Sequence, residues 1–395
     1  MELPDYHYYK HIFSGHSFPL AFVDLDLFDE NIRQIKSRAG EKNIRIASKS
    51  IRCTALLERI LKADAQFQGI MAYHPSEAIF LVQKGFHNIL LGYPCVNSEQ
   101  VNEVLNEQKY RKEIIFMIDS EEQANIIHQI ATQKETKAKV CIDIDMSVDF
   151  PGLHFGVYRS GINRSEKAKK LIENLAKMSH LEIAGIMGYE AQIAGLGNRI
   201  PGNLILNQII NFLQKRSIPI ITRRRKEVVE LLPKGKDYII NAGGTGSLES
   251  SSSEPWVTEV TAGSGFYSPG LFDYYKHFQH FPAMGFGLEI TRIPQPGIFT
   301  CAGGGYIASG TTENIKAPKP YLPEGIKLLP NEGAGEVQTP VKYKGEEKLK
   351  IGDPIFFRHS KAGELCERFQ TLYLVSKGKI VDQVETYRGS GQCFL

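Results

Sequence analysis

A lysine stands between two serines at the point where a short apolar segment ends. The stretch "RIASKSIRC" runs from Arg45 to Cys53, and Lys49 follows the apolar residues 44–47. A lysine at the carboxyl end of a buried strand is partly desolvated, which disfavours its ammonium form. The neutral amine is a nucleophile that forms a Schiff base with an aldehyde. From this stretch alone, the simpler interpretation is a lysine that reaches solvent or pairs with a carboxylate.

Two glycine-rich segments later in the chain have the composition of anion-binding loops. The segment "NAGGTGSLES" covers residues 241–250, and "TAGSGFYSPG" covers residues 261–270. Glycine lets the backbone approach an anion closely, and backbone N–H groups at the start of a helix bind it. Either segment alone is more simply explained as a turn. Both together favour a phosphate site.

Short apolar segments recur between Arg45 and Gly263, and most are followed by a segment with helical periodicity. Strands that alternate with helices form βαβ units and a parallel sheet. Eight such strands favour an α/β fold of the (β/α)8 TIM barrel type over an open doubly wound sheet. The expected strands read IRIAS, FQGIMAY, NILLGYP, IIFMIDS, AKVCIDIDMS, LEIAGIMGYE, YIINAGG and WVTEVTAG.

In such a barrel the active site is built from the loops at the carboxyl ends of the strands. Phosphate groups commonly bind at the loops after strands seven and eight, which is where the two glycine-rich segments fall. A lysine and a phosphate cradle on one barrel face suggest pyridoxal 5′-phosphate, with Lys49 as the residue that bonds to its aldehyde. The unusual residues at the expected strand ends are Lys49, His74, Tyr93, Asp119, Arg159 and Tyr189.

The character of the chain changes after Phe281. Short strands, many Gly and Pro turns and little helical periodicity predict an antiparallel β domain in this C-terminal part. We therefore expect a pyridoxal-phosphate-binding barrel at residues 19–281 and a C-terminal β domain at residues 282–395. Residues 1–18 form an N-terminal segment, which is a candidate strand of the β domain.

The composition is ordinary for a globular protein, with 42% hydrophobic and 23% charged residues among 395. A net charge of +3 gives no reason to expect nucleic acid or a membrane as a partner, and we interpret the basic run at 223–226 as a solvated helix face. Six cysteines form no CxxC pair. With no signal peptide or apolar membrane span in the sequence, we expect a cytoplasmic protein.

Five segments of the sequence are similar to a known family of enzymes. They read PLAFVDLDLFDENI, IRIASKSIRC, FGVYRSGI, GYEAQIAG and NAGGTGSL. The chain resembles the alanine-racemase-like (fold type III) pyridoxal-phosphate enzymes, and within them the branch of D-threonine aldolase and D-serine dehydratase, which includes proteins described as amino acid deaminase/aldolase. The resemblance implies a barrel with a C-terminal β domain, assembled as a homodimer with active sites near the subunit interface.

The resemblance also implies roles for single residues. Lys49 matches the Schiff-base lysine, and Arg159 matches the arginine that hydrogen-bonds the phenolic oxygen of the cofactor, where a permanent cation stabilises the phenolate. Tyr189 matches a position near the cofactor ring, whereas relatives often have histidine where Gln192 stands. Tyr267 is equally suited to capping the phosphate and to packing. The residues that match the phosphate-binding positions are Gly244, Thr245, Gly246, Gly263, Ser264 and Gly265.

Relatives in this branch bind a divalent metal through a histidine and an aspartate or cysteine two residues further on. A strand places residues i and i+2 on one face, so both can reach one ion. Here the histidine is His359, but the second position is Lys361, whose ammonium has no lone pair and repels a cation. His359 is therefore a metal ligand only if other groups, such as Glu364 or Cys366, replace the missing one, and metal binding stays open. Independently of a metal, His359 is a candidate catalytic base, with a structural role as the alternative.

The function that the resemblance implies is a lyase acting on D-3-hydroxy amino acids, with D-threonine aldolase-like cleavage to glycine and an aldehyde. The alternative is a D-serine/D-threonine dehydratase, which releases a 2-keto acid and ammonia. An amino-acid racemase would need a second base, for which Tyr306 is a weak candidate. A non-catalytic pyridoxal-phosphate carrier is disfavoured, because such carriers usually consist of the barrel alone.

Overall fold

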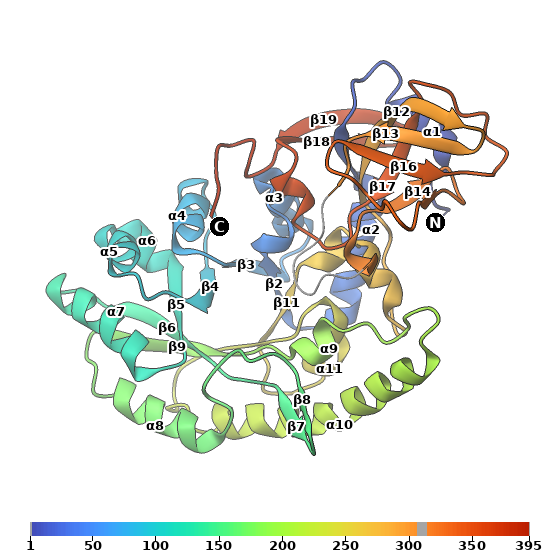
Figure 1. The fold of residues 1–395 in the computed structure, drawn as a ribbon. Coiled ribbons are helices and arrows are strands. Elements are labelled where there is room, and N and C mark those ends of the chain that lie inside the picture. Colours follow the sequence, from blue (N-terminus) through green and yellow to red (C-terminus); the bar gives the residue numbers. More distant parts are fainter. Residues whose placement is uncertain (1, 306–313, 395) are drawn as a thin grey trace.

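The computed structural model describes residues 2–305 and 314–394, which form a barrel surrounded by helices and a second part built mainly of strands (Figure 1). Eight parallel strands close the barrel in the order β10-β11-β2-β3-β4-β5-β6-β9. They are β2 (Asn43–Ala47), β3 (Phe67–Ala72), β4 (Ile89–Pro94), β5 (Ile114–Ile118), β6 (Ala138–Asp143), β9 (Leu181–Gly188), β10 (Ile239–Ala242) and β11 (Glu259–Ala262). The predicted (β/α)8 barrel and its eight strands are confirmed.

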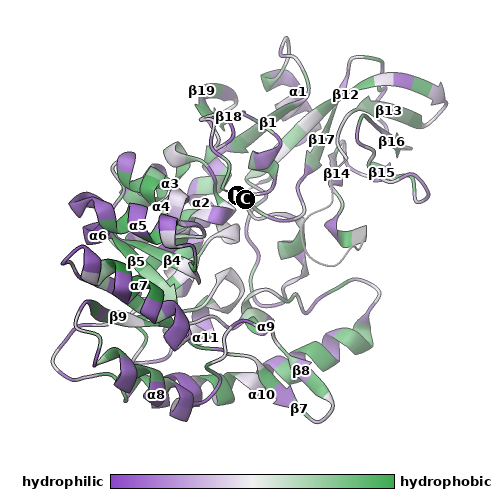
Figure 2. Ribbon diagram, turned by 60° about the vertical axis from the view of Figure 1, so that its left-hand side comes forward, coloured by the Kyte–Doolittle hydropathy of each residue, from purple (hydrophilic) through white to green (hydrophobic). Residues whose placement is uncertain are grey.

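The helices that surround the barrel turn their apolar residues inward. In α3, for example, Leu56, Leu57 and Ile60 are buried at helical spacing. Figure 2 shows hydrophilic residues along α5 to α8 and hydrophobic ones in β5. The helices are α2 (Leu25–Ala39), α3 (Thr54–Ala63), α4 (Pro75–Gln83), α5 (Ser98–Asn106), α6 (Gln108–Glu113), α7 (Glu121–Gln133), α8 (Ser165–Leu175), α9 (Ala191–Ala194), α10 (Leu204–Val229) and α11 (Leu248–Ser252). Among the described residues, no helix combines the length and the apolar character needed to cross a membrane.

The second part is a nine-stranded sheet, as expected of a barrel followed by a β domain. The predicted boundary differs in one respect, because residues 20–24, which we assigned to the barrel, form a strand of this sheet. Its pairings are antiparallel except that of β1 with β18, which is parallel. The strands are β1 (Leu20–Asp24), β12 (Met284–Gln295), β13 (Ile298–Ala302), β14 (Lys319–Leu322), β15 (Lys327–Leu328), β16 (Gln338–Lys342), β17 (Pro354–Arg358), β18 (Thr371–Ser376) and β19 (Lys379–Glu385). A separate hairpin consists of β7 (Val148–Phe150) and β8 (Leu153–Phe155).

The N-terminal segment differs from the prediction, because it forms a helix and not a strand. Helix α1 (Tyr6–Ile12) begins after Asp5, whose carboxylate accepts a hydrogen bond from the N–H of Tyr8 at 2.8 Å. Its buried residues Tyr6, Tyr9 and Ile12 recur every three positions, a helical spacing. They pack against the sheet of the β domain, where the Tyr9 ring lies 5.7 Å from that of Phe356.

The interior of the barrel contains an apolar layer and a buried ion pair. Leu90, Met117 and Met187 belong to the apolar cluster, and burying each such side chain contributes about 1.5–3 kcal/mol. The arginine of the "IRIAS" strand, Arg45, is fully buried and donates from Nε to Glu259 Oε1 at 2.6 Å. Its charge is therefore compensated within the barrel, which leaves the mouth to other residues.

Candidate active site

Lys49 lies in a short 3-10 turn, Ser48–Ser50, directly after β2. Its Nζ donates a hydrogen bond to the hydroxyl of Tyr93 at 2.9 Å. Tyr93 belongs to β4, so the two side chains meet at the carboxyl ends of two different barrel strands. The predicted desolvation of the Lys49 amine is wrong for the single chain, because the Lys49 side chain is exposed. The amine is held by its tyrosine partner and not by an apolar wall.

Arg159 lies on the other side of Tyr93. Its guanidinium carbon is 4.9 Å from the centre of the Tyr93 ring, and Nη2 donates to the Gly92 carbonyl at 2.5 Å. Burial raises the pKa of the Tyr93 hydroxyl, but the neighbouring cations Lys49 and Arg159 favour the phenolate more strongly, and the net pKa is below the ordinary value. Tyr93 is thus a phenol enclosed by two positive charges.

Asp143, at the end of β6, fixes the orientation of Arg159. Its Oδ2 accepts a hydrogen bond from Arg159 Nε at 2.7 Å. Burial raises the pKa of the Asp143 carboxyl to about 7, and Arg159 opposes that rise. The other oxygen, Oδ1, is buried and has no hydrogen-bond partner among the described residues. Arg159 is therefore a cation at the barrel mouth, and Asp143 fixes the orientation of its guanidinium group.

The two glycine-rich segments lie side by side after neighbouring strands, as predicted. Each forms a 3-10 turn, Thr245–Ser247 after β10 and Ser264–Phe266 after β11. The Thr245 hydroxyl accepts a hydrogen bond from the N–H of Gly265 at 3.1 Å and so joins the turns. At Gly246, a Cβ would overlap the Ala194 carbonyl, so only glycine allows this approach. The N–H groups of Gly244 and Gly265 are bonded to the hydroxyls of Ser247 and Thr245, so an anion would bind to other N–H groups at the start of the turns, such as that of Gly246.

The glycine turns are connected to the lysine and are supported from behind. Ser50, next to Lys49, has its hydroxyl 3.3 Å from that of Ser264. Arg38 Nη2 donates to the Thr245 carbonyl at 2.7 Å. In a trans peptide the C=O and the following N–H point in opposite directions, so the N–H of Gly246 faces away from Arg38. The predicted phosphate-binding residues and Lys49 are thus brought to one end of the barrel.

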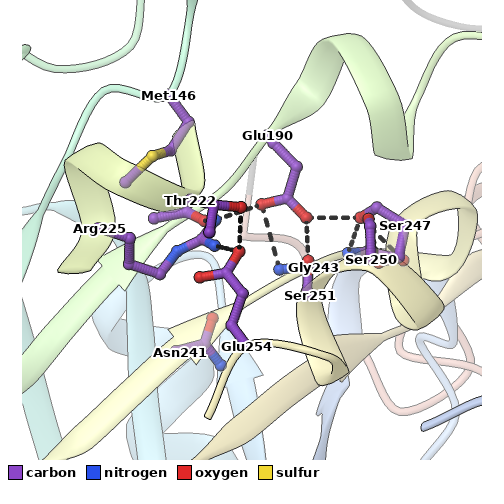
Figure 3. Close-up of polar contacts among 12 residues, drawn as sticks. Met146, Glu190, Thr222, Arg225, Asn241, Gly243, Ser247, Ser250, Ser251 and Glu254 are labelled. Atoms are coloured by element: carbon purple, nitrogen blue, oxygen red, sulfur yellow. Dashed lines mark hydrogen bonds and ion pairs between the residues drawn. The ribbon is translucent and has the colours of Figure 1, made fainter. Parts of the chain in front are cut away.

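A buried polar network holds the loop after β10 in place (Figure 3). The Glu190 carboxylate accepts hydrogen bonds from the Ser247 hydroxyl at 2.6 Å and from the Ser251 hydroxyl at 2.5 Å. It also accepts from Arg225 Nη2 at 3.0 Å and from the Gly243 N–H at 3.3 Å. Because all of these groups are buried, the carboxylate fixes both the backbone and the hydroxyls of the loop.

Arg225 corrects the interpretation of the basic run at 223–226 as a solvated face. Its side chain is 0% exposed and pairs with Glu190 and also with Glu254. Arg223, two residues earlier, is 82% exposed and pairs with Glu227 on the surface. The run therefore contains one buried arginine whose two ion pairs support the site, a difference that the sequence pattern of four cations does not reveal.

Tyr189 and Gln192 follow β9 and lie beside the glycine turn. A Cβ at Gly244 would lie 3.0 Å from Tyr189 Cε2, so the tyrosine ring covers that glycine. Burial raises the pKa of Tyr189 to about 12, which keeps its hydroxyl protonated. Gln192 donates from Nε2 to the Met146 carbonyl at 2.6 Å and is buried. Tyr189 therefore lies beside the glycine turn, and its predicted place near the cofactor ring stays a prediction, whereas Gln192 binds the neighbouring loop.

The C-terminal β domain encloses the turn that carries Lys49. At Gly363 the backbone lies so close that a Cβ would overlap the Lys49 carbonyl. Arg52 pairs with Glu367 at 2.7 Å, and the Arg52 carbonyl accepts from the N–H of Tyr387 at 2.8 Å. The position of the lysine is therefore set by both parts of the molecule.

His359 is enclosed next to this site. It follows the last residue of β17 and is 0% exposed, with its ring 6.2 Å from the Tyr267 ring. Burial, together with Arg358, lowers the pKa of His359 to about 3, so the ring is neutral at neutral pH. Neither ring nitrogen has a hydrogen-bond partner in the described part of the chain. Tyr267 is also fully buried and donates to the Ile51 carbonyl at 2.9 Å, so it packs.

The residues around His359 do not fit a divalent metal. The expected strand alternation fails, since β17 ends at Arg358 and both His359 and Lys361 lie beyond it. Within residues 2–305 and 314–394, no group of three or more His, Cys, Asp or Glu side chains converges on one point. The Cys366 thiol instead donates to the Ile51 carbonyl at 3.4 Å. Burial lowers the pKa of Lys361, and Lys49 lowers it further, which places a second lysine near the first.

Sequence reasoning missed three residues of the site. Tyr93 was noted only as a polar residue at a strand end, and its contact with Lys49 spans 44 positions. Asp143 and Glu190 have a signal of the same kind, because each is an acidic residue at or just after the carboxyl end of a barrel strand. Tyr306, the candidate second base of a racemase, lies outside the described residues.

The chain matches a family model in its sequence and several solved structures in its fold. The family model "Alanine racemase, N-terminal domain" matches residues 23–220. No curated protein is significantly similar in sequence. Among solved structures, D-threonine aldolase from Filomicrobium marinum has a TM-score of 0.77 at 17% identity, over 94% of this chain and 95% of that one.

Two other solved structures are also similar in fold. D-threo-3-hydroxyaspartate dehydratase from Delftia sp. HT23 has a TM-score of 0.73 at 16% identity, over 94% of this chain and 98% of that one. Alanine racemase of Clostridium difficile 630 has a TM-score of 0.65 at 18% identity, over 94% of this chain and 99% of that one. These likenesses extend over both the barrel and the β domain.

Proposed function

Because this chain belongs to the family defined by the alanine racemase N-terminal domain, we propose that it is a pyridoxal 5′-phosphate-dependent lyase acting on D-3-hydroxy amino acids. The proposed reaction is D-threonine aldolase-like cleavage to glycine and an aldehyde. The observation that carries the proposal is the placement of the Lys49 amine, beside Tyr93, at the same barrel end as two joined glycine turns. The likeness of fold to the aldolase and the dehydratase is the reason for preferring their type of substrate.

The residues at the barrel mouth fit the chemical groups of this cofactor. The glycine turns offer backbone N–H groups to a phosphate, and Arg38 orients one of these peptides from behind. Arg159, a permanent cation fixed by Asp143, suits a phenolate oxygen. Lys49 would bond to the aldehyde, as its exposed amine is accessible there. These are the groups that we propose hold the cofactor.

Pyridoxal 5′-phosphate, when bound, supplies an electron sink for a bond broken at the α-carbon of an amino acid. The chain contributes positive charge for a substrate carboxylate through Lys361, whose charge acts on Lys49, and through Arg159, which contacts Tyr93. His359 remains our proposed base for the 3-hydroxyl proton. Its ring is neutral at neutral pH, but a pKa of about 3 makes it a weak base, so the role also requires that substrate binding raise this pKa. That role requires substrate to reach a side chain that is now 0% exposed.

The cofactor assignment is tested by chemical trapping. Borohydride treatment of the protein mixed with pyridoxal 5′-phosphate should attach the cofactor irreversibly to Lys49, as located by peptide mass spectrometry. Lys49→Ala should abolish the labelled peptide. Lys361→Ala, which removes the neighbouring lysine, should keep it. Label on another lysine in Lys49→Ala would overturn the assignment.

The reaction is tested by product analysis. D-threonine and D-serine should each be supplied with and without a chelator. Acetaldehyde and glycine from D-threonine support the aldolase, whereas a 2-keto acid and ammonia support the dehydratase alternative. Exchange of the α-hydrogen for deuterium without either product would instead support a racemase.

We also propose that the protein is a homodimer, as the family resemblance implies. In support, α10 exposes apolar side chains at helical spacing, which is unusual for a face in contact with water. The exposed fractions are 78% for Leu204, 76% for Ile205, 49% for Ile209 and 57% for Phe212. A second copy of the chain is the occupant that we propose for this face.

A further inference from the structure

We propose that Tyr93 is a catalytic residue that accepts a proton from the Lys49 ammonium. The inference rests on the proposed function, since it requires that Lys49 be the amine that bonds to an aldehyde. Lys49 Nζ donates to the Tyr93 hydroxyl at 2.9 Å, within the range for direct proton transfer. An ammonium cannot attack a carbonyl, so a base in contact with this nitrogen has a defined task.

The surroundings of Tyr93 favour its anionic form. The Arg159 guanidinium lies 4.9 Å from the ring centre and is held in place by Asp143 and the Gly92 carbonyl. Lys361 is a further cation whose charge acts on this group, and Tyr189, which is protonated, is another titratable neighbour. The lowered pKa of Tyr93 agrees with this arrangement, in which two cations outweigh burial. A phenolate is therefore accessible at a lower pH here than in water.

The proposed step is a simple proton transfer. One N–H bond of the Lys49 ammonium breaks and the O–H bond of Tyr93 forms, which leaves a neutral amine and a neutral phenol. Tyr93 is 41% exposed, so its proton can pass on to water. Of the other side chains around the amine, Arg159 and Lys361 are cations and Asp143 is engaged with Arg159. His359, enclosed behind Tyr267, does not compete for this role.

The test measures the bond to Lys49 and not turnover. The full-length protein, freed of cofactor, is mixed with pyridoxal 5′-phosphate and quenched with borohydride after increasing times, and the labelled Lys49 peptide is quantified. At neutral pH we expect Tyr93→Phe to form the label about 100-fold more slowly than the natural protein. The final extent of labelling should be unchanged. Tyr158→Phe is the matched control, because Tyr158 is 89% exposed and precedes Arg159 directly.

A second variant separates proton transfer from mere positioning. Difluorotyrosine at position 93 keeps the shape of the side chain and makes the phenol more acidic, so the pH profile of the labelling rate should shift to lower pH. An unshifted profile, or an unchanged rate in Tyr93→Phe, overturns the role of Tyr93 while leaving the cofactor assignment intact. Absence of any Lys49 label in the natural protein would instead overturn the proposed function itself.

Discussion

Arg225 Nη2 donates to Glu190 Oε2 at 3.0 Å, and both side chains are completely buried beneath the loop that follows β10. Removal of one partner leaves an uncompensated charge, which is more costly than loss of the interaction alone. The same carboxylate holds the Ser247 hydroxyl and the Gly243 N–H. Stability and the shape of the proposed phosphate site therefore depend on one ion pair.

Arg225→Ala should lower the free energy of unfolding by about 3–5 kcal/mol, because it leaves Glu190 buried and unpaired. Arg223→Ala, in the same helix turn, removes an ion pair that is 82% exposed on its arginine side and should cost about 0–1 kcal/mol. Urea denaturation of both variants provides the measurement. Equal losses in the two variants would contradict the structural role of the buried pair.

Gly246→Ala should weaken the binding of pyridoxal 5′-phosphate by about tenfold or more, since the new methyl group would displace the turn from Ala194. Gly161→Ala is the control, because a Cβ there meets no atom within 4 Å. Titration of the cofactor-free protein, followed by the change in absorbance, measures both affinities. Identical affinities would show that the turn does not contact the cofactor.

His359 should make the protein less stable in acid. Its folded pKa is about 3, against an ordinary value of 6.5, so between these values the unfolded chain binds a proton that the folded one does not. The free energy of unfolding should therefore fall by about 1.4 kcal/mol for each pH unit below the ordinary value. His359→Gln should remove this component from the pH dependence measured by urea denaturation.

Phe212→Glu should convert the proposed dimer to a monomer, because it places a charge in an apolar contact. Sedimentation velocity measures the masses of the variant and the natural protein. Ile351→Glu, at an exposed apolar residue of the β domain, is the control and should leave the mass unchanged. A natural protein that sediments as a monomer would rule out the proposed assembly.

The barrel was predictable because each strand is a local pattern, a short apolar run followed by a helix, and the glycine turns could be placed by counting those strands. The site could be predicted only in part. Lys49 and Arg159 were found from the chain itself, but their common neighbour Tyr93 was not assigned a role, since its contact with Lys49 joins positions 44 apart. Burial of Arg225 depends on Glu190, which is 35 positions away in the sequence. The run of four cations at 223–226 was therefore interpreted as a solvated helix face.

Other differences have local causes. Residues 6–12 form a helix in which the buried side chains recur every three positions, a pattern too short to weigh against the strand-rich context. The argument that His359 and Lys361 share a strand face failed because the strand ends one residue before the histidine. In both cases the boundary of an element decided the outcome, and boundaries are set by packing more than by composition.

Gly363 leaves no space for even a methyl group between the second part of the molecule and the backbone carbonyl of Lys49. A truncated protein that retained the whole barrel would keep the lysine, the tyrosine and both glycine turns. It would lose the backbone contact that supports the turn carrying Lys49. Replacing the second part of the chain with another domain would therefore require a residue as small as glycine at this contact.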